Sequence, residues 1–312
     1  MAPHLVDRQF GRWDWRLVRA DPNRDARRPH AAAQRLLQFA TVRADPTTAL
    51  QPGRPLVTLR RMQLTVLGSG TAVPVPDRFP AGYLVRNGST NLMVDCGPGA
   101  LRRLAQAGVS PKHLDALLLT HYHTDHCADV AALLFALRSP HLSPRPPLRI
   151  YGAPGLRRLV AKLTEAWPWL QPREGLVLEL IEVSPGTFDV GGVEVTAVPI
   201  RHTAQSLGYR LRGDTGALAL SGDADTCDEL VELARDCDVF VCDTATPDGH
   251  KLEGHLTPGL AGGYAQRANV RTLVLTHFYP DCDGVDLVAQ AKATFDGDVR
   301  MAEDLLRIDI GA

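Results

Sequence analysis

The sequence of 312 residues lacks the features that mark membrane proteins and disulfide-stabilised secreted domains. Its longest apolar patch lies around residues 131–137, far short of the roughly 20 residues that a helix needs to cross a bilayer. Its six cysteines include no C-x-x-C pair and are too sparse for a disulfide scaffold. We therefore expect a globular protein of the cytoplasm with reduced thiols, long enough for one large domain or two small ones.

The first 62 residues lack lysine, glutamate and serine altogether. They hold 12 arginines and five aspartates, a net charge of +7, whereas the remaining residues carry −8. The segment has no apolar core of a secretory signal and, without serine, makes a poor transit peptide. One helix over residues 31–42 fits its pattern. We expect residues 1–61 to be a basic, weakly ordered extension, with a nucleic-acid tether as the alternative, and residues 62–312 to form the folded domain.

From Met62 onward, short apolar strands alternate with helices. The pattern predicts strands at 63–68, 82–86, 91–95, 115–120, 177–183, 192–199, 207–212, 216–221, 238–243 and 272–276. It predicts helices at 98–107, 127–138, 154–166, 226–235, 257–268 and 284–294. The strands cluster in each half, which favours two facing sheets covered on the outside by helices, an αββα sandwich of the α/β class.

The segment LLLTHYHTDHCADV places three histidines and an aspartate within six positions, directly after an apolar strand. Alternation puts His121 and His123 on the same side of an extended segment. Asp125 and His126 then lie at the turn into the predicted helix, so the loop can present two pairs of ligands to two neighbouring cations. A lone histidine is usually structural, but packing this many polar groups together is costly unless a cation binds them. Imidazole nitrogen and carboxylate oxygen suit zinc best among the common metals.

Two metal sites need more ligands than this loop offers. His202, Asp223 and His277 each come directly after a later apolar strand. Loops that leave strand ends converge into sites on a rigid scaffold. We therefore expect these three side chains to complete the two sites, with the carboxylate of Asp223 able to bridge both ions.

Seven segments, found in the expected order between residues 62 and 312, resemble the metallo-β-lactamase superfamily and are most similar to its ribonuclease Z branch. They are LGSGTAVPVP, VDCGPG, THYHTDH, HTAQSLGYR, SGDADTCDEL, GHLTP and LTHFYP. The resemblance implies a catalytic domain with the αββα fold and two Zn²⁺ ions per chain. It assigns the ligands as His121, His123 and His202 on one zinc, Asp125, His126 and His277 on the other, and Asp223 between them.

The resemblance also implies hydrolysis by a zinc-bridging hydroxide, which Asp125 would orient while ligating zinc. His255 in GHLTP matches the family's G-H-S-T motif, with Leu in place of Ser, and is the candidate that protonates the leaving oxygen. Its alternative is an exposed loop histidine. Asp243 stands where ribonuclease Z has a glutamate in a His-Glu-Ala-Thr motif; it either fixes the tautomer of His255 or is structural. Asp95 is expected to support the histidine loop by hydrogen bonding, and GSGTAVP to be a tight turn that lines the site.

The family members that trim tRNA carry a long tRNA-gripping arm, which in bacterial enzymes lies between the third motif histidine and the bridging aspartate. Here His202 and Asp223 are 21 positions apart, which leaves room for only two strands and a turn. The net charge of −8 beyond the first 62 residues opposes binding of a long RNA, although the basic segment at 138–149 could partly offset it. We therefore favour a small phosphodiester or related ester as substrate over precursor tRNA.

Other functions stay open. The first alternative is a tRNA 3′-processing endoribonuclease, and the second is a mononuclear iron oxygenase of the same fold, which would need fewer ligands. A flavodiiron protein would have a glutamate within the histidine motif and a flavin domain, and a non-catalytic scaffold would have lost ligands; neither fits this sequence. We expect no membrane partner, and a homodimer remains an open alternative.

Overall fold

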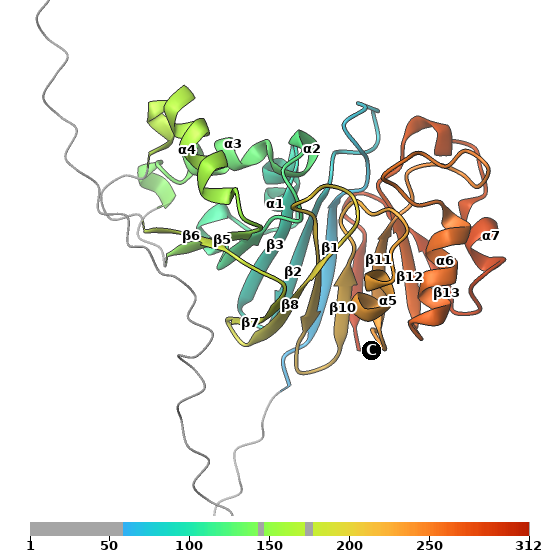
Figure 1. The fold of residues 1–312 in the computed structure, drawn as a ribbon. Helices are drawn as coiled ribbons and strands as arrows, with labels where there is room; N and C mark the ends of the chain where they lie inside the picture. Colours follow the sequence, from blue (N-terminus) through green and yellow to red (C-terminus); the bar gives the residue numbers. More distant parts are fainter. Residues whose placement is uncertain (1–58, 143–146, 172–176, 312) are drawn as a thin grey trace, which may run out of the picture. The chain divides into compact units, whose positions relative to one another are not determined.

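The computed structural model describes residues 59–142, 147–171 and 177–311, and these form two seven-stranded sheets that face each other (Figure 1). The first sheet has the order β14 (Arg307–Ile310), β1 (Met62–Gly68), β2 (Gly82–Asn87), β3 (Thr90–Cys96), β4 (Ala116–Leu118), β5 (Leu148–Gly152) and β6 (Leu178–Glu182). The second has the order β13 (Asp298–Met301), β12 (Thr272–Thr276), β11 (Val239–Asp243), β10 (Ala217–Leu220), β9 (Leu207–Arg212), β8 (Val193–Pro199) and β7 (Gly186–Val190).

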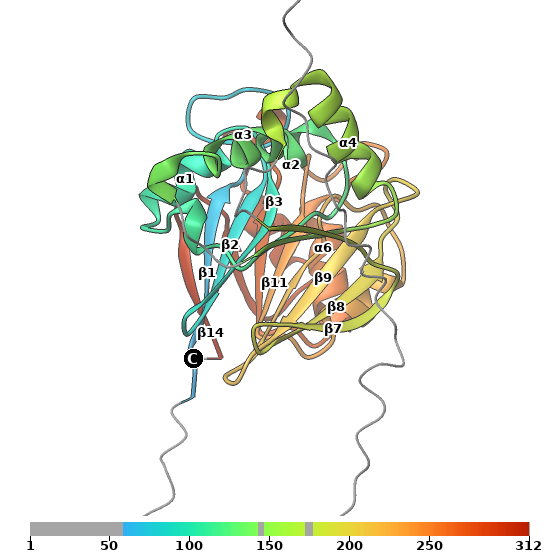
Figure 2. The same ribbon diagram turned by 90° about the vertical axis from the view of Figure 1, so that its left-hand side faces the viewer.

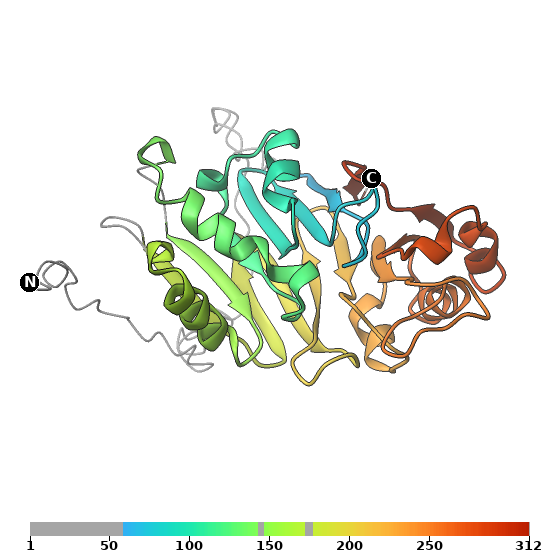
Figure 3. The same cartoon turned by 90° about the horizontal axis from the view of Figure 1, so that it is seen from above.

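Helices cover the outer faces of both sheets. Beside the first sheet lie α1 (Ala100–Gln106), α2 (Thr124–Cys127), α3 (Asp129–Ala136) and α4 (Leu156–Ala166), as Figure 2 shows. Beside the second lie α5 (Glu229–Ala234), α6 (Pro258–Arg267) and α7 (Leu287–Lys292). From above, the green helices of the first half and the orange and red helices of the second lie to opposite sides (Figure 3). The predicted αββα sandwich is therefore confirmed.

The core follows from the two-residue alternation of side chains in the strands. In β3, Leu92 and Val94 point into the core between the sheets, whereas Met93 points into the core beneath the helices. Asp95 has a positive φ and the pairing with β2 shifts register beside it, so Cys96 joins Met93 beneath the helices. Both faces of this sheet are covered, so β1 and β3 are buried at nearly every position. That continuous burial makes the sheets a rigid base for the loops at their ends.

The functional edge of the molecule is where parallel strands end. Strands β3 to β6 are parallel in the first sheet, and β10 to β13 are parallel in the second. Open α/β sheets bind ligands beyond the carboxyl ends of such strands. The helix α2 lies at this edge, at the top of the sheets in Figure 1.

The structure differs from the sequence-based expectation in several elements. The helix predicted over 127–138 begins earlier, at Thr124, and is divided at Ala128 into α2 and α3. The strands β5, β7, β13 and β14 were not predicted. β5 lies at the end of the segment expected to form a basic patch, and its Arg149 forms an ion pair with Glu179 at 2.9 Å.

Further expectations concern a helix at 31–42, the state of the cysteines and membrane-spanning helices. The helix expected at 31–42 lies outside the described residues. All six cysteines are free thiols. Within the described ranges, no helix is both long and apolar enough to cross a bilayer.

Candidate metal centre

The histidine loop projects its side chains from the carboxyl end of β4. The strand ends at Leu118, and His123 is extended (φ −64°, ψ 149°) just before the first turn of α2. His121 and His123 face the same region, with ring centroids 4.6 Å apart. Asp125 and His126 lie within α2 itself and are buried. One strand end and one short helix thus present four polar side chains at one point.

Three side chains from the second sheet reach this loop, and Asp223 is the central one. Its Oδ1 lies 2.9 Å from Nε2 of His126 and 3.2 Å from Nε2 of His277. Its Oδ2 lies 3.6 Å from Nε2 of both His121 and His202. The two carboxylate oxygens therefore face two different groups of histidines.

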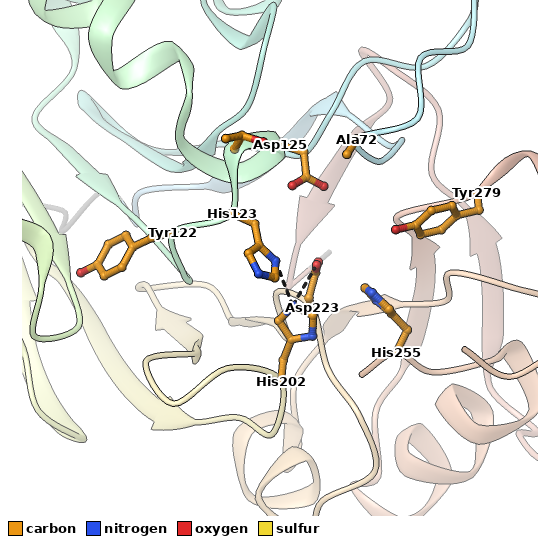
Figure 4. A pocket seen from close by; sticks show the side chains of 9 residues that line it. Ala72, Tyr122, His123, Asp125, His202, Asp223, His255 and Tyr279 are labelled. Atoms are coloured by element: carbon orange, nitrogen blue, oxygen red, sulfur yellow. Dashed lines mark hydrogen bonds and ion pairs between the residues drawn. The ribbon is translucent and has the colours of Figure 1, made fainter. Parts of the chain in front are cut away.

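All seven predicted ligands lie together, in two clusters that share Asp223. In each cluster, one donor atom per residue lies within 4.8 Å of every other. The members are His121, His123, His202 and Asp223 in the first cluster, and Asp125, His126, Asp223 and His277 in the second. Figure 4 shows His123, His202 and Asp223 turned toward one another at the base of a pocket.

Donor atoms at the centre of the clusters fit a cation. Nε2 of His121 is fully enclosed and makes no hydrogen bond to the described part of the chain. Such buried polar atoms are costly unless something binds them. Two ligand atoms that bind one tetrahedral zinc ion at 2.0–2.1 Å lie about 3.3 Å from each other. Distances from Asp223 to His126 (2.9 Å) and from Asp125 to His126 (3.8 Å) bracket that value.

An open cavity of about 420 Å³ leads to the clusters, a volume in the range of small-molecule sites. It is lined by Ala72, Tyr122, His123, Thr124, Asp125, His202, Asp223, His255 and Tyr279. Ala72 comes from the glycine-rich turn near the start of the domain, which was expected to line the site.

Comparison with known proteins identifies the family. The sequence profile of the β-lactamase superfamily domain matches residues 90–278, more than half of the chain. The chain belongs to the β-lactamase superfamily.

Relatives in this superfamily indicate the branch to which the chain belongs. A ribonuclease Z of Mycobacterium bovis (strain BCG) is 30% identical over 275 residues, which cover 80% of this chain and 98% of that protein. An uncharacterized protein of Mycobacterium tuberculosis is 35% identical over 262 residues, covering 78% of this chain and 90% of its own. The crystal structure of the metallo-β-lactamase fold protein YhfI from Bacillus subtilis has a TM-score of 0.71 at 25% identity, covering 80% and 99% of the two chains. The chain is a metal-dependent hydrolase of the ribonuclease Z-like branch.

Asp95 supports this β-lactamase superfamily site by hydrogen bonds. Its carboxylate accepts hydrogen bonds from the Thr120 backbone N–H at 2.8 Å and from Nδ1 of His126 at 2.8 Å. With Nδ1 so engaged, Nε2 of His126 is left to face the cluster. Asp95 and His277 both have positive φ angles, of 57° and 65°. Non-glycine residues rarely adopt this conformation, and it concentrates at functional sites.

The side chain of His202 is held by Gly254, a contact that was not predicted from the sequence. Its Nδ1 donates to the carbonyl oxygen of Gly254 at 2.8 Å. The N–H of Gly254 donates to Asp225 at 2.8 Å, and Lys251 forms an ion pair with the same carboxylate at 2.7 Å. The pattern D-A-D at 223–225 was the available signal, because alternate residues share one side of an extended segment.

His255 lies at the rim of the second cluster, buried rather than exposed. Its Nδ1 lies 2.9 Å from Oδ2 of Asp243, which is itself fully buried. Burial lowers the pKa of His255, but the hydrogen bond and charge of Asp243 outweigh it, so the pKa is raised above its usual value. The pair therefore has the geometry of a histidine whose proton is stabilised beside the cavity.

Charges within the clusters are tightly balanced. Burial opposes ionisation of Asp223, but the charges of His126 and His277 hold the pKa of Asp223 well below its usual range. Burial disfavours the charged form of His277 as well, yet Asp223 and Asp125 raise the pKa of His277 to about 10. Burial and the neighbouring charge of His126 lower the pKa of His121 to about 2. Without a cation, protons on His126 and His277 therefore supply the positive charge that these carboxylates require.

Proposed function

We propose that this enzyme is a binuclear zinc phosphodiesterase that cleaves a small phosphodiester or related ester. The observation that supports it best is the position of Asp223, whose two oxygens face two separate clusters of histidines at 2.9–3.6 Å. In this proposal, residues 62–312 are the catalytic domain and residues 1–61 are an extension. The enzyme acts in the cytoplasm.

The seven side chains divide between two ions as the family resemblance implies. His121, His123 and His202 would hold one zinc, and Asp125, His126 and His277 would hold the other, with Asp223 available to both. Bound zinc supplies a nucleophile by lowering the pKa of water, and it neutralises charge that develops on the substrate. A mononuclear iron site is the alternative, and metal analysis separates the two.

Residues of the chain orient the attacking water and transfer a proton to the leaving group. The carboxylate of Asp125 lines the cavity and accepts a hydrogen bond from the attacking water. His255 gives its proton to the leaving ester oxygen, since its ring lies at the cavity wall. Asp243 binds Nδ1 of that ring and so keeps Nε2 toward the substrate.

A small substrate is favoured by the connection between His202 and Asp223. It consists of β9, β10 and short loops, so no long arm is inserted there. The second candidate is tRNA 3′ processing, which the 30% identity to a ribonuclease Z along 98% of its length supports. A homodimer is compatible with either function.

A hydrolysis panel tests the proposal. We expect purified protein to hydrolyse bis-p-nitrophenyl phosphate, and we expect His123→Ala and Asp223→Ala to lower its kcat by about 100-fold or more, because each removes a metal ligand. Deleting residues 1–58 should leave this rate unchanged. Cleavage of a 3′-extended tRNA far faster than any small ester would favour the second candidate, and no hydrolysis of any phosphate ester would contradict both.

A further inference from the structure

The cavity wall contains no lysine or arginine among the described residues that line it. Two cations in the surrounding loops are already held by carboxylates. Lys251 pairs with Asp225 at 2.7 Å, and Arg78 pairs with Asp283 at 2.6 Å. Among the described residues that line the cavity, none therefore offers a permanently cationic side chain to a phosphate group.

Buried carboxylates also limit the charge that metal ions could offer. Asp95, Asp125, Asp223 and Asp243 are all buried around the clusters. Their four negative charges equal the charge of the two divalent ions proposed above, so a protonated His255 would supply the one positive charge in excess. A phosphate monoester carries close to two negative charges at neutral pH, whereas a diester carries one. This charge balance favours the diester.

Tyr279 offers the cavity a neutral hydrogen-bond donor. Its ring packs edge-on against His255 and His277, with centroids 6.0 Å and 6.1 Å away. Its backbone N–H is fixed by a hydrogen bond to the carbonyl oxygen of Ala245 at 3.1 Å. In Figure 4 the hydroxyl points into the cavity, toward Asp125. Within the part of the chain that the structure describes, this hydroxyl has no hydrogen-bond partner.

The second tyrosine of the cavity lies differently. The hydroxyl of Tyr122 donates to the carbonyl oxygen of Ala153 and points away from the clusters in Figure 4. The two tyrosines lie on opposite sides of the cavity in Figure 4, and only the hydroxyl of Tyr279 faces the clusters. Tyr122→Phe therefore serves as a contrast, because it removes a hydroxyl that anchors the histidine loop rather than one that faces the cavity.

We propose that the hydroxyl of Tyr279 donates a hydrogen bond to a phosphoryl oxygen of the phosphodiester substrate. The inference rests on the proposed function. A phenol O–H can donate without adding charge. Because Tyr279 packs against His255, this contact turns the leaving oxygen toward the proposed proton donor.

The test compares wild type, Tyr279→Phe and Tyr122→Phe. Rates are measured on bis-p-nitrophenyl phosphate and on p-nitrophenyl phosphate, and the dissociation constant of diphenyl phosphate, a diester with a poor leaving group, is measured by calorimetry. Tyr279→Phe should lower kcat/KM on the diester, and weaken binding of diphenyl phosphate, by about 10- to 100-fold, because it loses one hydrogen bond to a charged acceptor. Metal content and Tm should stay at wild-type values.

Tyr122→Phe should lower kcat/KM only as far as it lowers metal content, because its hydroxyl anchors the histidine loop and does not face the substrate. Wild type should hydrolyse the monoester with a kcat/KM about 100-fold lower than the diester, because the surplus charge meets no cation. A wild type that cleaves the diester while Tyr279→Phe matches it would overturn the inference and leave the phosphodiesterase proposal intact. A wild type that prefers the monoester would contradict the phosphodiesterase proposal itself. A wild type inactive on both esters would remove that proposal, and the inference with it.

Discussion

At the residue scale, Asp243 connects the proposed proton donor to the metal ligands. One carboxylate oxygen lies 2.9 Å from Nδ1 of His255, and the other lies 3.5 Å from Nδ1 of His277. The carboxylate is fully buried and also accepts the backbone N–H of Ala224 at 3.0 Å. Its charge therefore acts mainly on these two imidazoles.

This arrangement predicts a pH dependence. A histidine that donates a proton must be protonated, so kcat should fall as the pH rises through the pKa of His255. Asp243 raises that pKa by its hydrogen bond and charge, against the effect of burial. Asp243→Asn should therefore lower the pKa and move the fall in kcat to lower pH. His255→Ala should lower kcat by about 100-fold or more and abolish this limb.

The measurement is kcat against pH on bis-p-nitrophenyl phosphate for the three proteins. Asp214→Asn is a suitable control, because this exposed carboxylate accepts a hydrogen bond only from the backbone N–H of Arg60 within the described residues. An alkaline limb that stays in place in Asp243→Asn would show that another group supplies the proton.

The seven site residues could be predicted from the sequence because each follows an apolar strand directly or closely, and the ends of parallel strands meet at one edge of a sheet. It does not reveal Asp225 or Gly254 as partners of His202. That contact depends on how the loop before α6 folds back, which local pattern does not encode. The metal-binding role of the seven residues stays a prediction, although the structure brings them together.

At the element scale, the turn after β3 must approach α2 closely. A Cβ added to Gly97 would lie 2.0 Å from the carbonyl oxygen of Asp125 and 2.8 Å from that of Ala81. Both are backbone atoms, so neither can turn aside. Gly97 therefore sets the distance between the end of the first sheet and the helix that carries two proposed ligands.

Gly97→Ala should lower the free energy of unfolding by about 1–3 kcal/mol and reduce bound metal, because overpacking displaces α2. Gly263→Ala is the matched control. Gly263 lies in α6 with no atom within 4 Å of an added Cβ, so alanine there should be neutral or stabilising by up to about 1 kcal/mol. Chemical denaturation with metal analysis measures both effects; wild-type metal content in Gly97→Ala would contradict the role assigned to this turn.

Strands β1 to β4 were predictable because each contains a run of buried apolar residues. The strands that were missed are short or polar on one face. β14 has the sequence RIDI and β13 has DVRM, each with alternate exposed positions. β7 forms only through its antiparallel pairing with β8. Such strands are set by tertiary pairing rather than by local composition.

At the scale of the whole molecule, metal binding and folding should be linked through protons. Burial disfavours the charged forms of His277 and His126. Neighbouring carboxylates nevertheless raise the pKa of His277 to about 10 and the pKa of His126 well above its usual value. A group whose pKa is raised on folding stabilises the metal-free fold below its unfolded pKa of about 6.5. That stabilisation is lost as the pH rises toward 10. Metal binding needs neutral imidazoles, so it strengthens over the same range.

The difference in Tm between metal-loaded and chelator-treated protein should therefore grow from pH 6 to pH 9. At saturating metal, the stabilisation should be about 5 °C or more. Differential scanning calorimetry in matched buffers measures both states. A difference in Tm that is constant or shrinks with rising pH would show that these imidazoles do not exchange protons for metal.

The most direct test of the shared site is the metal content of purified protein, measured by inductively coupled plasma mass spectrometry for wild type and Asp223→Ala. We expect about two zinc ions per chain in the wild type and a marked loss in the variant, because one carboxylate faces both clusters. One iron per chain, or two zinc ions retained without Asp223, would contradict a bridged pair of zinc sites.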